Sequence, residues 1–307
     1  MSMRIRRARI AHRCLFNPVV WLAVGAVSTL VVSAPWSRGA GAGITTREGP
    51  VAAALPTHAH VVVVVEENRS AAGVIGNKSA PYINSLATAG ALMMQSFAIT
   101  HPSEPNYLAL FAGDTFGLAS DACPVDRGAA PNLGSELLAG GQTFTGYSED
   151  LPSVGSTTCG SGKYVRKHAP WVNFTNVPPA NSVPFSSFPP NSDYASLPTV
   201  AFVIPNLDND MHDGSVAQGD AWLNNHLSAY ATWAKANNSL LVITWDEDDN
   251  GENNQIPTIF YGANVKTGAY GEPVTHYSVL STLEQMYGLN TTGNAANVPA
   301  ITDIWVH

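Results

Sequence analysis

Four clusters of polar side chains each follow an apolar run, and together they hold the residues that could perform chemistry. The clusters are Glu66–Asn68, His101–Asn106, Asp208–His212 and Asp246–Asp249. Ligands of open α/β folds bind outside the carboxyl ends of the strands, so four such clusters are expected to line one crevice. Any one cluster alone fits a solvated turn after a core strand equally well. Their recurrence favours a binding or catalytic site.

Carboxylates dominate these clusters and predict a divalent metal ion. Oxygen donors suit Mg²⁺, Ca²⁺ or Mn²⁺, and a set that also contains histidine suits Zn²⁺ or iron. Without a cation, so many facing carboxylates would repel one another. A single carboxylate is more often a helix cap or a turn residue, and Asp220 fits the first turn of a helix as well as a ligand. The six candidate carboxylates are Glu66, Glu67, Asp208, Asp210, Asp246 and Glu247.

Ser103 is the candidate nucleophile. It lies between Pro102 and Pro105, where a strand is expected to pass into a helix. This position would hold its backbone and direct its hydroxyl into the crevice, at a helix N-terminus that favours phosphate. A metal ion could lower the pKa of the hydroxyl. The alternative is a helix-capping serine. The chain has no G-x-S-x-G motif, which counts against an α/β-hydrolase esterase.

Lys163–His168 is a basic cluster in an otherwise acidic body. Six of the 15 basic residues precede residue 43, so 9 basic and 23 acidic side chains remain, a net charge of −14. Such an acidic body argues against non-specific nucleic-acid binding, which draws on Lys and Arg contacts to phosphates. The basic cluster is expected to clamp a phosphate, with solvated surface charge as the alternative.

The N-terminal segment predicts export. An arginine-rich start and the apolar run Leu15–Val32 are typical of a secretory signal peptide, here residues 1–42, with an uncleaved membrane anchor as the alternative. Residues 43–57 are expected to be a flexible leader, and residues 58–307 a single catalytic domain. No later run is long enough to cross a bilayer, so the mature protein is expected to be secreted without a stable membrane span.

Two cysteines remain after the predicted cleavage. Cys123 and Cys159 are expected to form a disulfide in an oxidising compartment, closing a loop of roughly 35 residues.

Apolar runs alternate with helical patterns, which predicts a three-layer α/β/α fold, a mostly parallel sheet with helices on both faces. The five consecutive valines after His60 suit a strand buried between two layers. Ser148–Pro198 reads as one long loop, expected to be functional. The expected strands are His60–Val65, Ala91–Ile99, Gln142–Tyr147, Thr199–Ile204, Leu240–Trp245 and Ile256–Tyr261, and the expected helices are Ser79–Ala89, Tyr107–Ala112, Leu133–Ala139, Ala217–Ala236 and Tyr277–Tyr287.

Five motifs in a fixed order carry a family resemblance from about residue 57 to the C-terminus. They are Glu66-Glu67-Asn68-Arg69-Ser70, His101-Pro102-Ser103-Glu104-Pro105-Asn106-Tyr107, Tyr164-Val165-Arg166-Lys167-His168-Ala169-Pro170-Trp171, Asn209-Asp210-Met211-His212-Asp213-Gly214 and Ile243-Thr244-Trp245-Asp246-Glu247. The chain resembles the phosphoesterase family that groups bacterial phospholipases C with secreted acid phosphatases, within the alkaline-phosphatase-like superfamily. The resemblance is closest to the mycobacterial secreted acid phosphatases.

The resemblance implies a role for each of eight further residues beside Ser103, the implied nucleophile. It implies that His168 and His212 act in catalysis or proton transfer, that Asn106 and His276 bind phosphate, and that the divalent metal is bound by Glu67, Asn68, Asp246 and Glu247. We also expect phosphate binding by Lys167 and Arg166 of the basic cluster and by His101 of the Ser103 cluster. The implied activity is a metal-assisted phosphatase that forms a phosphoserine intermediate. Its expected partners are phosphate monoesters, phosphoinositide lipids such as phosphatidylinositol 3-phosphate at a membrane surface among them, and the protein is expected to be a monomer. Two alternatives stay open: a phospholipase C-type phosphodiesterase with the same site, and a non-catalytic metal-binding surface protein.

Overall fold

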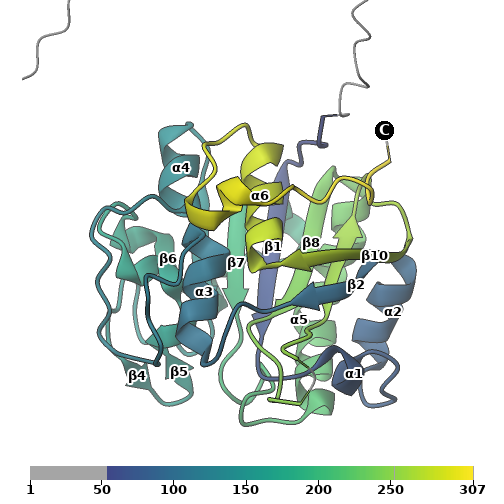
Figure 1. Ribbon diagram of the computed structural model, residues 1–307, viewed down its shortest axis with the longest axis horizontal. Helices are drawn as coiled ribbons and strands as arrows, with labels where there is room; N and C mark the ends of the chain where they lie inside the picture. The colour runs from purple at the N-terminus through teal and green to yellow at the C-terminus, as the bar shows by residue number, and fades with distance from the viewer. Residues whose placement is uncertain (1–53, 252, 307) are drawn as a thin grey trace, which may run out of the picture. The chain divides into compact units, whose positions relative to one another are not determined.

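The valine run forms strand β1, His60–Glu66, near the middle of an eight-stranded sheet (Figure 1). The computed structural model describes residues 54–251 and 253–306, which belong to one compact unit. The predicted signal peptide and most of the predicted leader lie outside the described residues. No helix in the described part of the chain is long and apolar enough to cross a membrane.

The sheet is parallel except for one strand, which confirms the predicted mostly parallel sheet. The strand order is β10-β2-β9-β8-β1-β7-β3-β6, and β9 alone runs antiparallel to its neighbours β8 and β2. The chain passes from β8 to β9 without a helix, and antiparallel pairing is the arrangement that needs no crossover helix. The strands are β1, β2 (Ala91–Phe97), β3 (Phe144–Ser148), β6 (Ser182–Pro184), β7 (Val200–Ile204), β8 (Ser239–Trp245), β9 (Thr258–Gly262) and β10 (Gly268–Thr275), with a small separate hairpin of β4 (Gly160–Ser161) and β5 (Tyr164–Val165).

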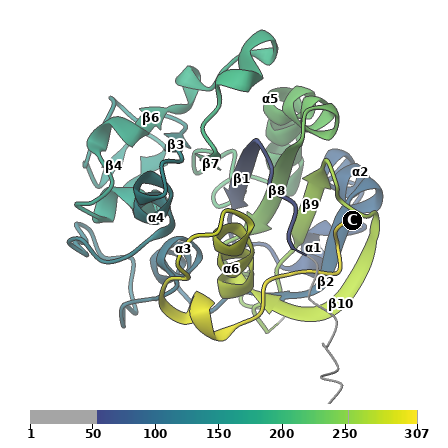
Figure 2. The ribbon, with the colours of Figure 1, turned by 90° about the horizontal axis from the view of Figure 1, so that it is seen from above.

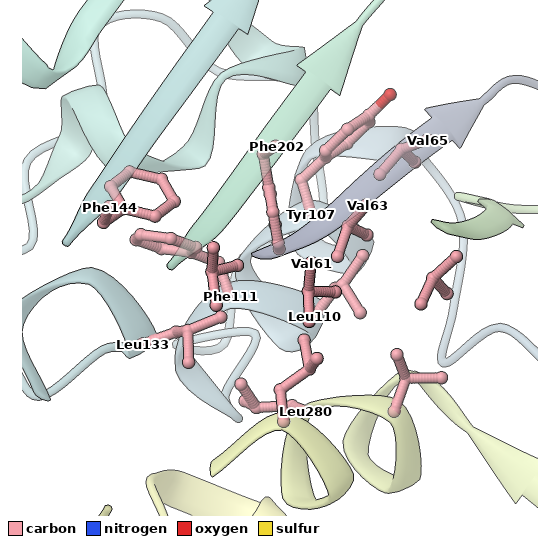
Figure 3. Close-up of a cluster of buried hydrophobic side chains, with 14 of the residues drawn as sticks. Val61, Val63, Val65, Tyr107, Leu110, Phe111, Leu133, Phe144, Phe202 and Leu280 are labelled. Atoms are coloured by element: carbon pink, nitrogen blue, oxygen red, sulfur yellow. The ribbon is translucent and has the colours of Figure 1, made fainter. Parts of the chain in front are cut away.

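Helices cover both faces of the sheet, as predicted (Figure 2). They are α1 (Ala71–Val74), α2 (Pro81–Ala89), α3 (Ser103–Ala112), α4 (Leu133–Ala139), α5 (Val216–Ala236) and α6 (His276–Met286). Successive valines of β1 point to opposite faces. Val61, Val63 and Val65 pack into the core with α3, α4 and α6, part of which Figure 3 shows. Val62 and Val64 pack with α2 and α5. The polar residues after β1 are thus held at the edge of a sheet with two apolar cores.

Helix α1, which was not expected, and three other parts of the chain differ from the sequence expectation. Helix α3 begins at Ser103, not Tyr107, because Pro105 is compatible with the first turn, where backbone N–H groups have no intrahelical partner. Strand β10 escaped prediction because it is an edge strand with alternating exposure that contains Pro273. The segment 148–198, expected to be one loop, also contains β4, β5, β6 and several 3₁₀ turns.

A disulfide joins Cys123 to Cys159, as predicted, with their Cα atoms 5.8 Å apart. It ties the segment that follows α3 to the 148–198 segment. The carbonyl of Cys159 accepts a hydrogen bond from the backbone N–H of Arg166 at 3.0 Å. Cys123 lies two residues after Asp121 in the sequence, and Cys159 is hydrogen-bonded to Arg166 of the basic cluster.

Candidate active site

Backbone hydrogen bonds join three of the four polar clusters at the carboxyl ends of β1, β7 and β8. The N–H of Glu67 donates to the carbonyl of Asp210 at 2.7 Å, and the N–H of Asp246 donates to the carbonyl of Glu66 at 3.0 Å. The N–H of Asn68 donates to Asp246 Oδ1 at 3.2 Å. The predicted convergence of these strand ends on one place is therefore present in the fold.

Ser103 brings in the fourth cluster from the first residue of α3. Its hydroxyl is buried, with 1 % of the residue exposed, and donates to Glu67 Oε2 at 3.2 Å. Pro102, not Ser103, occupies the N-cap, so the serine side chain does not cap the helix. Burial raises the pKa of Glu247 to about 7, and a hydrogen bond from Ser103 opposes that rise. The hydroxyl thus faces the carboxylates of Glu67, Asp246 and Glu247 at a helix N-terminus, where a phosphoryl group is favoured.

The residues around Ser103 hold the loop that leads into α3. Asn106 Oδ1 accepts the backbone N–H groups of Ile99 and Thr100, both at 3.0 Å, and its Nδ2 donates to the Thr100 carbonyl at 2.8 Å. The side-chain amide of Asn106 is therefore occupied by hydrogen bonds to backbone groups. They give it a positioning role before any contact with phosphate, and its predicted phosphate contact stays a prediction.

His101 contacts the late carboxylates. Its Nδ1 lies 2.8 Å from Glu247 Oε2 and its Nε2 lies 3.3 Å from Asp248 Oδ1. With 34 % of its side chain exposed, His101 stands between these carboxylates and solvent. It can therefore orient Glu247.

A buried group of Glu67, His168 and Asp210 could hold a metal ion. One ligand atom from each lies within 4.8 Å of the others. His168 Nε2 is 3.2 Å from Glu67 Oε1, and His168 Nδ1 is 3.4 Å from Asp210 Oδ2. Glu67 was predicted as a ligand. His168 was assigned to catalysis, and Asp210 was only one of six candidate carboxylates, because the sequence does not show which way a side chain after a strand turns.

Buried polar atoms that make no hydrogen bond support a cation at this place. In the described part of the chain Asp246 Oδ2 makes none, and Asp210 Oδ2 and His168 Nε2 have only the ion-pair contacts given above. Burial raises the pKa of Glu67, Asp210 and Asp246, and nearby carboxylates add to the rise for Glu67 and Asp246. Burial lowers the pKa of His168 well below its usual value, which leaves a neutral imidazole able to bind a metal. The residues present therefore fit a divalent cation, which would supply the missing positive charge.

Lys167 and His212 lie at the margin of this site. Lys167 Nζ is 2.7 Å from Asp121 Oδ2. Burial raises the pKa of Glu67, and the positive charge of Lys167 acts to lower it. His212 is 30 % exposed at its side chain, and its ring centroid is 6.2 Å from that of His168. Its Nδ1 lies 2.8 Å from Asp213 Oδ1. Both positions agree with the expected roles in phosphate binding and proton transfer, which stay predictions.

The Arg166 guanidinium is buried and donates to neutral groups, and its predicted phosphate contact stays a prediction. It donates to the carbonyls of Thr157 and Val125 at 3.0 and 2.9 Å and to Asn173 Oδ1 at 3.1 and 3.3 Å. Asn173 Nδ2 in turn donates to Glu104 Oε1 at 3.3 Å. Arg166 thus fastens the 148–198 segment to the start of α3, and so positions Lys167 and His168.

Arg166→Lys is expected to destabilise the protein and to lower activity through this displacement. A lysine cannot make the forked set of bonds, and hydrogen bonds to a charged group contribute about 1.5–3 kcal/mol. We expect a loss of about 2–4 kcal/mol in unfolding free energy by denaturant titration, with reduced kcat. Arg127→Lys is the matched control, because the Arg127 guanidinium lies over the Phe116 ring, 5.3 Å from its centroid, where a lysine can substitute. Equal losses in both variants would contradict the positioning role.

His276, also predicted to bind phosphate, is buried below the strand ends. Its Nε2 lies 2.9 Å from the carbonyl of Trp245, the residue before Asp246. Burial lowers its pKa to about 4, so the ring is neutral near pH 7. Its Nδ1 has no hydrogen-bond partner in the residues that the structure describes. The visible contact supports the end of β8, and the phosphate role stays a prediction.

Glu66 and Asp220 lie on the face of the sheet that α2 and α5 cover, opposite to the face that α3 covers. Asp220 Oδ1 and Oδ2 accept the backbone N–H groups of Ile83 and Tyr82 at 2.8 and 3.2 Å. Asp220 therefore caps the start of α2 from α5, a contact between helices that the sequence could not show. By the alternation of β1, Glu66 points to the α5 face, where burial raises its pKa and Asp210 adds to the rise.

The chain matches one family model and is similar in sequence to known proteins. The model of the Phosphoesterase family matches residues 77–290. A phosphatidylinositol-3-phosphatase from Mycobacterium tuberculosis is 66 % identical over 288 residues, 93 % of this chain and 95 % of the relative. A phosphate-repressible acid phosphatase from Penicillium chrysogenum is 31 % identical over 235 residues, 69 % of this chain and 55 % of the relative.

Solved structures share the fold at low sequence identity. A protein of the alkaline phosphatase superfamily from Vibrio parahaemolyticus has a TM-score of 0.57 and 11 % identity, over 81 % of this chain and 71 % of that chain. A lipoteichoic acid synthase from Listeria monocytogenes has a TM-score of 0.56 and 10 % identity, over 78 % of this chain and 74 % of that chain. These likenesses show a common α/β architecture.

Proposed function

Because the chain belongs to the phosphoesterase family, we propose that it is a secreted phosphatase that hydrolyses phosphate monoesters, phosphoinositides among them. One observation carries the proposal: the buried Ser103 hydroxyl at the first turn of α3 donates to Glu67 Oε2. A hydroxyl, a helix N-terminus and several carboxylates at one place are the parts that phosphoryl transfer through a serine ester needs. The 66 % identical relative is named for the removal of a phosphate from a phosphoinositide, which supports the substrate class.

The reaction follows from the placement of Ser103. Its oxygen attacks phosphorus in line with the ester oxygen, the P–O bond to the alcohol breaks, and a phosphoserine forms. Water then attacks the phosphoserine and releases phosphate, which restores the serine. The positive end of α3 and the Lys167 ammonium hold the charge on the phosphoryl oxygens.

A divalent cation in the carboxylate cluster would neutralise phosphoryl charge and favour the alkoxide form of Ser103. The ligands proposed for it are Glu67, Asn68, Asp246 and Glu247. Glu67 also belongs to the buried group of Glu67, His168 and Asp210 that could hold a metal ion. Asn106 and His101 hold the approach to Ser103, and His276 supports the strand end before Asp246.

The departing alkoxide requires a proton. His212 is exposed enough to exchange protons with solvent, and Asp213 at its Nδ1 leaves Nε2 free to donate. His168, buried and neutral, can accept the proton of the attacking group. We assign His212 to the alcohol and His168 to the nucleophile side, because His168 Nε2 is 3.2 Å from Glu67, which contacts Ser103.

Export and domain extent complete the proposal. The Cys123–Cys159 disulfide suits an oxidising compartment, which supports a signal peptide over residues 1–42. Residues 43–57 would then be a leader and residues 58–307 the catalytic domain of a monomer, acting on lipid phosphates at a membrane surface without a span of its own.

A panel of esters tests the function and its rivals. We expect the purified protein to release phosphate from p-nitrophenyl phosphate and from vesicles with phosphatidylinositol 3-phosphate. A chelator should remove the activity, and one of Mg²⁺, Ca²⁺, Mn²⁺ or Zn²⁺ should restore it. Faster release of a phosphorylated head group from phosphatidylcholine would instead indicate a phospholipase C-type phosphodiesterase. Loss of thermal stability on chelation with no hydrolysis of any ester would indicate a non-catalytic metal-binding protein.

A further inference from the structure

Tyr107 lies one helical turn after Ser103 on the same face of α3. Both hydroxyls donate to the same carboxylate, Ser103 to Glu67 Oε2 at 3.2 Å and Tyr107 to Glu67 Oε1. Figure 3 shows the Tyr107 ring beside β1, with its hydroxyl directed toward the carboxyl end of that strand. The side chain is almost wholly buried, so its hydroxyl is inaccessible to solvent and donates to this one carboxylate. Two donors on α3 therefore bracket Glu67.

The Tyr107 ring also contacts the candidate catalytic histidine. It stacks on the His168 ring with centroids 5.0 Å apart and planes 14° from parallel. His168 Nε2 lies 3.2 Å from Glu67 Oε1, the oxygen that Tyr107 binds. A single side chain thus touches both the proposed metal ligand and the proposed base, and its hydroxyl and its ring act on different partners.

A glutamate carboxylate needs such a restraint to present one chosen oxygen. The terminal torsion of Glu has a broad, two-fold profile, so the two oxygens exchange places unless one of them is held. The Tyr107 hydroxyl holds Oε1 beside His168, which leaves Oε2 toward Ser103. Ser103 alone cannot do this once its hydroxyl becomes the nucleophile and its hydrogen bond to Glu67 is given up.

We propose that Tyr107 is a positioning residue that fixes which Glu67 oxygen faces the nucleophile and its metal, acting through its hydroxyl. This inference rests on the proposed function, since it assigns a task within that reaction. In metal sites, groups that hydrogen-bond to a ligand orient it, and their removal costs 10–100-fold in metal affinity or activity. Tyr107 is of this kind, and the resemblance of the motifs assigns it no role.

Tyr107→Phe separates the hydroxyl from the ring. Phenylalanine keeps the buried volume and the stack on His168, so packing and histidine placement persist. We expect kcat to fall by about 10–100-fold while KM changes little, because the groups that hold phosphate are untouched. Independently of activity, Mn²⁺ binding, followed by loss of the free-ion EPR signal, should weaken by about the same factor.

Tyr82→Phe is the matched control, because the Tyr82 hydroxyl on α2 is buried without a hydrogen-bond partner among the described residues. Its removal should leave both kcat and Mn²⁺ affinity unchanged. If Tyr107→Phe behaves like Tyr82→Phe, or lowers only the melting temperature of the metal-free protein, Tyr107 has a structural role alone and the inference is overturned. If the wild-type protein neither binds a divalent ion nor hydrolyses any ester, the proposed function fails first and this inference fails with it.

Discussion

Replacement of Ser103 by alanine is expected to abolish turnover while the protein stays folded. Without the hydroxyl no phosphoserine can form, and loss of a catalytic nucleophile costs at least about a thousandfold in kcat. Stability should change little, because Pro102 and not Ser103 occupies the N-cap of α3. The variant loses one hydrogen bond to Glu67, a contribution of about 0.5–1.5 kcal/mol.

The matched control for this variant is Ser70→Ala. Ser70 is a genuine N-cap: its hydroxyl accepts the N–H of Gly73 at the start of α1. Its replacement should lower stability by about 1 kcal/mol and leave kcat near the wild-type value. Mass spectrometry of acid-quenched wild-type protein should show one phosphate on the peptide that contains Ser103. Substantial phosphatase activity in Ser103→Ala, or a phosphate on another residue, would refute the assignment of the nucleophile.

The position of the site could be predicted from sequence because it depends on periodicity. Five valines in a row admit a strand buried on both faces, and such a strand fixes where its polar followers must lie. The same reasoning located the ends of β7 and β8. Glu67, Asp210 and Asp246 meet where the strands end, and this meeting needed no knowledge of side-chain direction.

The tasks of individual side chains could not be predicted in the same way, because they depend on contacts between distant segments. Arg166 and Lys167 are neighbours in one basic motif, yet Arg166 turns into the protein toward Asn173 while Lys167 turns toward Asp121. Asp220 looks like a helix residue or a ligand, and it caps a helix other than its own. Motif resemblance locates such residues, but only the packed structure separates those that face the crevice from those that support it.

Asp246→Asn is expected to make the metal-free protein more stable and the metal-bound protein less active. Asp246 Oδ2 is buried without a hydrogen-bond partner in the described residues, close to the charges of Glu247 and Glu67. Asparagine keeps the size and the oxygen that accepts the N–H of Asn68, and it removes one charge from a set of facing carboxylates. Without metal, this relief of repulsion should raise the melting temperature by a few degrees.

With metal present, Asp246→Asn is expected to have an unfavourable effect on the protein. A lost carboxylate ligand weakens cation binding, so the rise in melting temperature on adding Mg²⁺, Ca²⁺, Mn²⁺ or Zn²⁺ should shrink, and kcat should fall by at least about a hundredfold. Asp220→Asn gives the opposite pattern, because Asp220 accepts two backbone N–H groups of α2. That control should lose stability with and without metal and keep the metal-induced shift. A metal-free Asp246→Asn protein that is less stable than wild type would show that Asp246 stabilises the fold. A carboxylate that serves to bind a cation should instead destabilise the protein whenever the cation is absent.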